Sequence, residues 1–317
     1  MKSSSTLFPV SLLRADMIGD INEDVYLVKH NQDSDRTVEV AVSHLNLRDK
    51  KAHLGSVVLV HGSFSNRSFW LSNKGEGLAR HLLEQGFDVW LFEHRSHGDS
   101  VRNKDFRNNT VERYVRFDLP AVNDFVHEQS GQFPAWIGHS LGGVMIATAV
   151  ACNLLRKDNC KAIVLLGTQT LKRPSYLWIP FMGTYLKIKA RRTGEMDGRA
   201  MGIGPENEPY GVIREFVRRY KLFGGWRVHQ PKQKLLPAWK AMQHIPLLAV
   251  AGKLDEVDAG KACVKFAQMY GGKKDIIFLA KEQGFSQDYG HVDMVVSKAA
   301  AQEVWPRISA WLTQSKH

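Results

Sequence analysis

The chain has 317 residues, of which 44% are hydrophobic and 24% charged, and its net charge is +11. This length suits one α/β domain of about 250 residues with an insertion, or two domains. No segment approaches the ~18 consecutive apolar residues of a membrane-spanning helix. We also predict no signal peptide, because Pro9, Ser11 and Arg14 interrupt the first apolar stretch. The three cysteines have neither paired nor metal-ligand spacing, so we expect a cytoplasmic protein in a reducing compartment.

The excess positive charge is concentrated in one segment. Between Thr168 and Gln243 there are fifteen Lys and Arg residues against five Asp and Glu residues, a net charge of +10. This segment has no zinc-ligand spacing, no RNA-binding aromatic signature and no helix-turn-helix pattern, so we expect no nucleic-acid partner. A localised basic surface suits an anionic lipid surface, an acidic partner or an anionic substrate. A merely solvated cationic face stays open as an alternative.

Two kinds of strand follow an opening segment that lacks periodicity. Residues 1–20 are expected to form an irregular lead-in. Residues 23–30 and 37–45 alternate apolar and polar side chains, as antiparallel strands do. Continuous apolar runs predict buried strands of a parallel sheet. These runs lie at 56–62, 87–94, 135–139, 161–167, 247–252 and 275–280.

Helical spacing fills the intervals between the apolar runs. Helices are predicted at 75–85, 110–129, 140–155 and 259–270, with a terminal helix to about residue 312. Pro120 should kink or break the second of these. Strands that alternate with helices predict an α/β fold with a mostly parallel sheet and helices on both faces.

The alternation stops between residues 168 and 243. This segment is rich in aromatic residues and is too long for a connecting loop, so it is expected to be an inserted, largely helical cap. The predicted core is then made of residues 1–167 and 244–317.

A serine lies in a tight turn between a predicted strand and a predicted helix, in Gly138-His139-Ser140-Leu141-Gly142. The pattern G-x-S-x-G in this context is that of a nucleophile elbow. The turn strains the backbone, and glycines at 138 and 142 remove the collisions that larger side chains would cause. Ser140 is therefore a candidate nucleophile, and the amide of Leu141 is placed to face a developing oxyanion.

A serine nucleophile needs a base and an acid that orients the base. Asp255 follows the predicted strand at 247–252, and His291 lies in the loop before the last helix, so the order along the chain is nucleophile, acid, histidine. Glu256 and Asp258 stay open as alternatives for the acid. Asp293 suits a carboxylate at the start of a helix.

Oxyanion stabilisation needs a second amide besides that of Leu141. The turn His61-Gly62 follows the first buried strand and presents the amide of Ser63, with that of Phe64 as the alternative. Phe64 and His139 are candidates for contact with the substrate, although His139 also suits packing under the turn. We expect neither a metal nor an organic cofactor.

These motifs together resemble those of the α/β-hydrolase superfamily. The resemblance rests on HGSF at 61–64, EHRSHGDS at 93–100, GHSLGG at 138–143, GKLD at 252–255 and GHVD at 290–293. The run FDVWLFEHRSHGDS followed by FDLPAVNDFV is also similar to the acid-lipase-like branch of the superfamily. The chain departs from that branch by having GHSLGG where those lipases have GHSQG, and because we expect no secretory signal.

The resemblance implies a serine hydrolase that cleaves carboxylic esters through an acyl-enzyme, as an esterase or lipase. Aromatic residues beside Leu177, Ile179, Met182 and Leu186 suit an apolar acyl pocket, or equally the core of the cap itself. The basic cap adds an expectation of peripheral contact with an anionic lipid surface. Two other functions stay open: an acyltransferase with the same three residues, and a non-catalytic binding protein on this fold.

Overall fold

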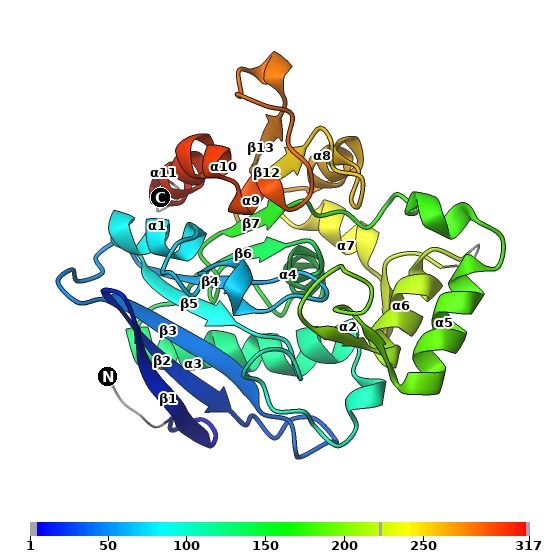
Figure 1. Ribbon diagram of the computed structural model, residues 1–317, viewed down its shortest axis with the longest axis horizontal. Helices are drawn as coiled ribbons and strands as arrows, with labels where there is room; N and C mark the ends of the chain where they lie inside the picture. Colours follow the sequence, from blue (N-terminus) through cyan, green and yellow to red (C-terminus); the bar gives the residue numbers. More distant parts are fainter. Residues whose placement is uncertain (1–4, 222–223, 315–317) are drawn as a thin grey trace.

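The computed structural model describes residues 5–221 and 224–314, and within them the chain forms a nine-stranded sheet in the order β1-β2-β3-β5-β4-β6-β7-β12-β13 (Figure 1). The strands are β1 (Val10–Ile18), β2 (Ile21–Val28), β3 (Val40–Leu47), β4 (Ser56–Val60), β5 (Asp88–Phe92), β6 (Ala135–His139), β7 (Ile163–Leu166), β12 (Leu247–Gly252) and β13 (Lys274–Leu279). Strands β1, β2, β3 and β5 pair antiparallel, and the rest of the sheet is parallel.

At strand β4 the order in which successive strands are added to the sheet reverses. The next strand in sequence, β5, pairs on one side of β4, and β6 pairs on the other side. In an open α/β sheet the loops at the carboxyl ends of the strands part at such a point and leave a crevice. Strands β4 and β6 are parallel neighbours, so the loops that follow them start side by side at this edge of the sheet.

Alternating side chains of the strands build one hydrophobic core on each face of the sheet. In β4, Val57 and Leu59 face one core, while Val58 and Val60 face the other. The first core is covered by α1 (Leu78–Gln85), α9 (Asp293–Val296), α10 (Lys298–Glu303) and α11 (Trp305–Gln314). The second is covered by α3 (Leu119–Ser130), α4 (Leu141–Ala151), α7 (Leu235–Ala241) and α8 (Gly260–Gln268). The predicted α/β fold with helices on both faces is confirmed.

The expectation of an irregular lead-in at residues 1–20 is wrong, because Val10–Ile18 forms the edge strand β1. Its register with β2 shifts between Leu12 and Arg14. This irregularity breaks the alternation of side chains along the strand. Most of its side chains are exposed, so burial imposes no clear pattern on the sequence. Pairing with β2, rather than the segment's own hydrophobicity, makes this strand.

Two predicted helices are divided in the structure. The first consists of α2 (Val111–Arg113), a π-helical turn at Tyr114–Asp118 and α3, with Pro120 in the first turn of α3 where its missing N–H costs little. The C-terminal helix is divided into α9, α10 and α11. Ser297 is extended and caps α10 by accepting a hydrogen bond from the amide of Ala300, so α9 ends before it.

Two kinds of packing occur in the segment between β7 and β12. The elements here are α5 (Met182–Thr193), α6 (Tyr210–Arg219), the hairpin of β8 (Glu195–Asp197) and β9 (Asn207–Pro209), and the hairpin of β10 (Arg227–His229) and β11 (Lys232–Lys234). Helices α5 and α6 share a small core of their own. Trp226 and Trp239 instead belong to the second core of the sheet, which α3, α4, α7 and α8 cover. The boundaries of the cap at 168 and 243 stay a prediction. Within the described ranges no helix is both long and apolar enough to cross a membrane.

Candidate active site

Ser140 stands at the turn between β6 and α4, in a strained backbone conformation with φ 51° and ψ −115°. A Cβ atom on Gly138 would lie 2.6 Å from the backbone of Gly142, and one on Gly142 would lie 2.6 Å from the carbonyl oxygen of His61. Larger residues at these two positions would collide with main chain, which cannot move aside. The amide of Ser140 donates to the carbonyl of Leu166, which fixes the turn against β7.

Asp255 and His291 form a hydrogen-bonded pair. Nδ1 of His291 lies 2.8 Å from Oδ2 of Asp255, and the Asp255 side chain is fully buried. The other carboxylate oxygen accepts the amides of Val257 at 3.0 Å and Asp258 at 2.7 Å, so the acid is held rigidly. A carboxylate at Nδ1 favours the tautomer with the proton on that nitrogen, which leaves Nε2 of His291 as an acceptor.

Glycines at the ends of the strands let these groups approach one another. A Cβ atom on Gly167, after β7, would lie 3.1 Å from Nδ1 of His291 and 3.2 Å from Oδ2 of Asp255. A Cβ atom on Gly62, after β4, would lie 3.2 Å from Cβ of Ser140. In the part of the chain that the structure describes, the Ser140 hydroxyl makes no hydrogen bond to His291. Such contacts often close only when substrate is bound.

The other candidate acids have different partners. Asp258 accepts a hydrogen bond from Nε2 of Gln169 at 2.8 Å, and its burial raises the pKa of its carboxyl to about 6. Asp293 begins α9 and accepts the amide of Gly290 at 2.7 Å, just before His291. Glu256 is exposed. The carboxylate that contacts the imidazole of His291 is therefore that of Asp255.

The two alternatives for the second oxyanion donor differ in whether their amide is occupied. The Phe64 amide donates to Oε1 of Glu208 at 2.9 Å, in a residue with φ 58°. Among the described residues the amide of Ser63 has no acceptor. The amide of Leu141 opens α4, where the first N–H groups have no partner within the helix. The geometry thus leaves the Ser63 and Leu141 amides for a ligand.

The His139 side chain packs beneath the elbow turn, and its contact with substrate stays a prediction. The side chain is buried, stacks on Phe69 at a centroid distance of 4.5 Å and places Nε2 2.9 Å from the carbonyl oxygen of His291. Burial lowers the pKa of His139 to about 3 and keeps the ring neutral. This is the packing alternative, and it gives His139 a positioning role toward His291. Phe64, half-buried, packs against the small core of α5 and α6.

Sequence reasoning missed the acids that connect β9 to the loop after β4. Besides the Glu208 contact, Oε1 of Glu206 accepts Nδ2 of Asn66 at 2.5 Å, and the Glu206 amide donates to the carbonyl of Phe64 at 3.0 Å. These residues lie about 140 positions apart in the chain. No local pattern predicts such a contact, because it depends on how the segment after β7 folds back.

Comparisons with known proteins bear on the fold and on the class of relatives. Residues 55–199 match the family model described as "alpha/beta hydrolase fold". Triacylglycerol lipase 2 of Arabidopsis thaliana is 37% identical over 178 residues, which are 53% of this chain and 41% of that protein. A tear acid lipase-like protein of Mesocricetus auratus is 30% identical over 35% of this chain and 30% of its own length. The chain thus spans less than half the length of these relatives.

A solved structure extends the likeness to most of the chain. The crystal structure of the monoacylglycerol lipase of Paleococcus ferrophilus superposes with a TM-score of 0.60 and 18% identity, covering 87% of this chain and 99% of that one. At this identity the likeness shows the fold. With the family model, the strand order and the solved structure in agreement, the chain has the α/β-hydrolase fold, and its relatives of similar sequence include lipases.

Proposed function

We propose that this protein hydrolyses carboxylic esters through an acyl-serine intermediate, with Ser140 as nucleophile. The observation that carries the proposal is the 2.8 Å pair of Asp255 and His291 beside a serine in a strained elbow. Lipases are among the relatives of similar sequence, which supports ester hydrolysis as the reaction class.

Each residue has one chemical task in this proposal. The Ser140 oxygen attacks the acyl carbon, and Nε2 of His291 takes the hydroxyl proton and passes it to the leaving alcohol. Asp255 holds the proton on Nδ1 and stabilises the imidazolium that forms. The amides of Ser63 and Leu141 hold the oxyanion. A water molecule, deprotonated by His291, then hydrolyses the acyl-enzyme.

The first test is labelling with a fluorophosphonate probe, followed by a series of p-nitrophenyl esters of increasing acyl length. Labelling of the wild type that is absent in Ser140→Ala is expected. Ser63→Ala is the matched control, because it removes a hydroxyl near the site and keeps the backbone amide that the proposal uses. It should retain both labelling and turnover.

The outcomes separate the alternative functions. Absence of labelling in the folded wild type would contradict the proposal and favour a non-catalytic binding protein. Transfer of the acyl group to an added alcohol in preference to water would instead make the protein an acyltransferase. An optimum at medium or long acyl chains supports a lipase-like substrate, whereas activity on acetyl esters alone would exclude it.

An exposed apolar face on α5 and the turn before it supports a lipid surface as the place where substrate is met. Trp178 is 69% exposed and Phe181 is 86% exposed, and Tyr185 and Ile188 follow Phe181 on the same side of α5. Exposed aromatic residues of this size are uncommon on a soluble monomer surface and indicate an interaction site. We call these four residues the aromatic face of α5.

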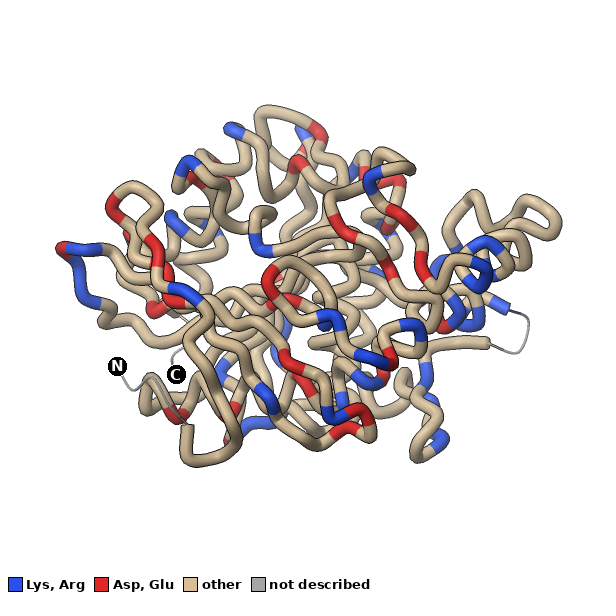
Figure 2. The backbone as a smooth tube through the Cα atoms, turned by 60° about the horizontal axis from the view of Figure 1, so that its bottom comes forward, with Lys and Arg blue, Asp and Glu red and all other residues tan. Residues whose placement is uncertain are grey.

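Basic residues surround the aromatic face. The guanidinium of Arg173 lies 4.8 Å from the centroid of the Trp178 ring, and Lys189, Arg191 and Arg192 are exposed on α5. Lys and Arg are also concentrated at the α5–α6 end of the molecule, on the right in Figure 2. Apolar residues rimmed by positive charge suit docking on an anionic lipid surface. We therefore include peripheral binding to anionic lipid in the proposed function.

Sedimentation with vesicles tests this binding apart from catalysis. Wild type should sediment with phosphatidylglycerol vesicles and much less with phosphatidylcholine vesicles. Phe181→Asp combined with Trp178→Asp should abolish the binding. Leu13→Asp, which changes an exposed apolar residue of β1, is the control and should bind as the wild type does. Equal sedimentation of the double variant and wild type would contradict the docking face.

A further inference from the structure

Three side chains of types that can bind a metal ion meet between the loop after β5 and strand β9. They are His94, His97 and Glu208, all buried, and one ligand atom from each lies within 4.8 Å of the others. Two of them come from the EHRSHGDS run, and the third comes from the segment between β7 and β12. The cluster lies outside the predicted catalytic residues and is not used in the proposed ester hydrolysis.

Several polar atoms of this cluster have no hydrogen-bond partner in the described part of the chain. Both ring nitrogens of His94, Nε2 of His97 and Oε2 of Glu208 are buried in this way. The His94 ring is enclosed by His61 at a centroid distance of 4.0 Å and by Tyr114 at 5.6 Å. Burying polar atoms without partners is unfavourable, so a shared ligand for them is favoured.

A hydrogen bond to the backbone directs the ligand atom of His97 toward Glu208. Nδ1 of His97 lies 2.9 Å from the carbonyl oxygen of Arg95, so it carries the proton and donates, and Nε2 is left with its lone pair. Nε2 of His97 lies 3.4 Å from Oε1 of Glu208. A histidine that donates its other N–H to a backbone carbonyl is the usual arrangement around a metal.

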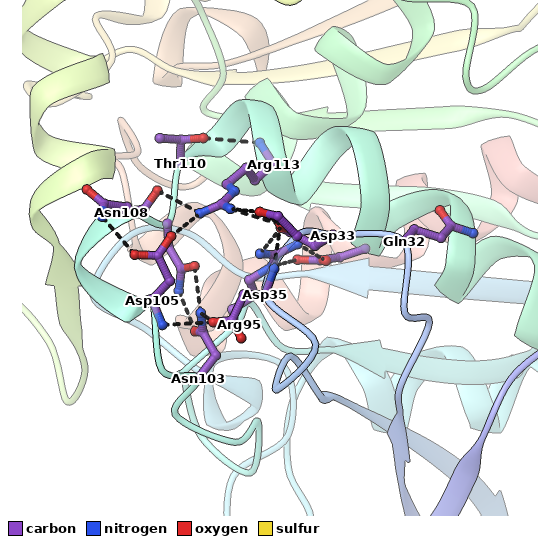
Figure 3. A network of polar contacts seen from close by, with 12 residues as sticks. Gln32, Asp33, Asp35, Arg95, Asn103, Asp105, Asn108, Thr110 and Arg113 are labelled. Atoms are coloured by element: carbon purple, nitrogen blue, oxygen red, sulfur yellow. Dashed lines mark hydrogen bonds and ion pairs between the residues drawn. The ribbon is translucent and has the colours of Figure 1, made fainter.

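Arg95 is itself held in place by an extensive polar network (Figure 3). Its guanidinium donates to both carboxylate oxygens of Asp118 at 2.6 Å and to Asp33 at 2.5 Å. Arg113 also binds Asp33, at 2.8 Å. The carbonyl that orients His97 therefore belongs to a fixed residue, and the ligand geometry does not depend on a mobile loop.

Two neutral imidazole nitrogens and one carboxylate make a donor set that suits zinc and similar divalent ions. A proton on His97 would satisfy its contact with Glu208, but it would leave both nitrogens of His94 and Oε2 of Glu208 without partners. A cation between the three side chains satisfies one nitrogen of each histidine and the carboxylate together. We propose that His94, His97 and Glu208 bind one divalent transition-metal ion, with Zn²⁺ the favoured occupant.

The position of the site gives the ion a structural task. Glu208 binds the Phe64 amide with the oxygen Oε1, so its carboxylate connects strand β9, the loop after β5 and the loop after β4. An ion held here would fasten β9 to the core and fix the carboxylate that holds Phe64. The site would therefore stabilise the fold and would take no part in the bond changes of ester hydrolysis.

The test uses the full chain, purified without a histidine tag and stripped of metal with a chelator. Co²⁺ titration should give a visible d–d absorption band that saturates at one ion per chain, and one equivalent of Zn²⁺ should displace it. Zn²⁺ should also raise Tm of the wild type. Glu208→Gln keeps an oxygen that can accept the Phe64 amide. It should weaken Co²⁺ affinity by more than the ~10–100-fold loss typical of changing a residue that contacts only a metal ligand.

Two comparisons keep the test decisive. His44→Gln changes another buried histidine, which lies 2.6 Å from Asp88 outside the cluster, and it should bind Co²⁺ as the wild type does. His94→Gln should lose the band. A wild type that binds no ion at one equivalent, or that binds as tightly as Glu208→Gln does, would overturn the proposal. These readouts do not require activity, so failure of the proposed ester hydrolysis would leave them unaffected.

Discussion

Asp255 and Asp258 lie three positions apart, and their different hydrogen-bond partners distinguish their predicted roles. Asp255 contacts His291, whereas Asp258 contacts Gln169. We predict that Asp255→Asn lowers kcat by about 10⁴-fold, because the amide favours the wrong tautomer of the histidine. Asp258→Asn should change kcat by no more than about tenfold, or ~1.4 kcal/mol. Steady-state kinetics of the two variants checks this, and the reverse order of effects would exchange the two roles.

Asp258 also gives a pH-dependent contribution to stability. Burial raises the pKa of its carboxyl from 3.8 to about 6. The folded state therefore binds the proton more tightly than the unfolded state, and Asp258 lowers the free energy of unfolding as pH rises from about 4 to about 6. The full effect is about 3 kcal/mol at most. Asp258→Asn should have a higher Tm than the wild type at pH 7 but not at pH 4. Thermal unfolding of both proteins at the two pH values measures the difference. A pH-independent difference would contradict the assignment.

The glycine after the elbow serine should tolerate no side chain. A Cβ on Gly142 would overlap the carbonyl oxygens of Val60 and His61, which are rigid main chain. Gly142→Ala should cost about 3 kcal/mol, at the upper end of the range for overpacking. Gly202→Ala is the control. A Cβ on Gly202 would meet no atom within 4 Å, so the only cost is that of placing a side chain at a positive φ, about 1 kcal/mol. Chemical denaturation measures both, and equal costs would show that the elbow can relax.

Sequence alone predicted those residues whose role follows from a local pattern. Ser140 lies in a five-residue motif. Asp255 follows an apolar run and His291 precedes a helix, so the order of strands predicts that these two residues lie close together. Glu208 has no such context. It reaches Phe64 only because β9 folds back onto the loop after β4, and residues without a local pattern cannot be placed before the fold is known.

At the scale of elements, the two ends of the predicted cap should respond differently to truncation. Trp239 of α7 is fully buried, stacks on Phe266 at 5.0 Å and donates from Nε1 to the carbonyl of that residue. Trp239→Ala should cost about 3–5 kcal/mol of unfolding free energy. Trp178→Ala, at an exposed site, should cost less than ~0.5 kcal/mol. Urea unfolding compares them; similar values would mean that both tryptophans support the same core.

Element boundaries failed where pairing or capping overrides periodicity. The buried parallel strands were predictable because burial on both faces leaves continuous apolar runs. Strand β1 was not, because it is exposed and its register shifts near Arg14. The division of the C-terminal helix depends on the extended backbone at Ser297, which an apolar pattern spanning residues 293–314 conceals.

For the molecule as a whole, the uneven charge predicts a salt-dependent interaction. The segment from Thr168 to Gln243 carries nearly all of the excess positive charge. Raising the salt concentration from about 0.1 M to about 1 M shortens the screening length from ~10 Å to ~3 Å. Binding to phosphatidylglycerol vesicles should therefore fall steeply over this range, while esterase activity on a dissolved ester stays nearly constant. Vesicle binding that is insensitive to salt would mean that apolar contact alone holds the protein on the surface.

The contact between Glu208 and the Phe64 amide also has a consequence for protein engineering. Exchange of caps between related hydrolases treats the cap as a module that selects substrates. Here the segment between β7 and β12 supplies the acceptor for a backbone N–H beside the elbow. A chimera that carries a foreign cap without this carboxylate would leave that N–H without its acceptor. Grafts into this scaffold should therefore keep strand β9 with Glu206 before it, and exchange only the helices around them.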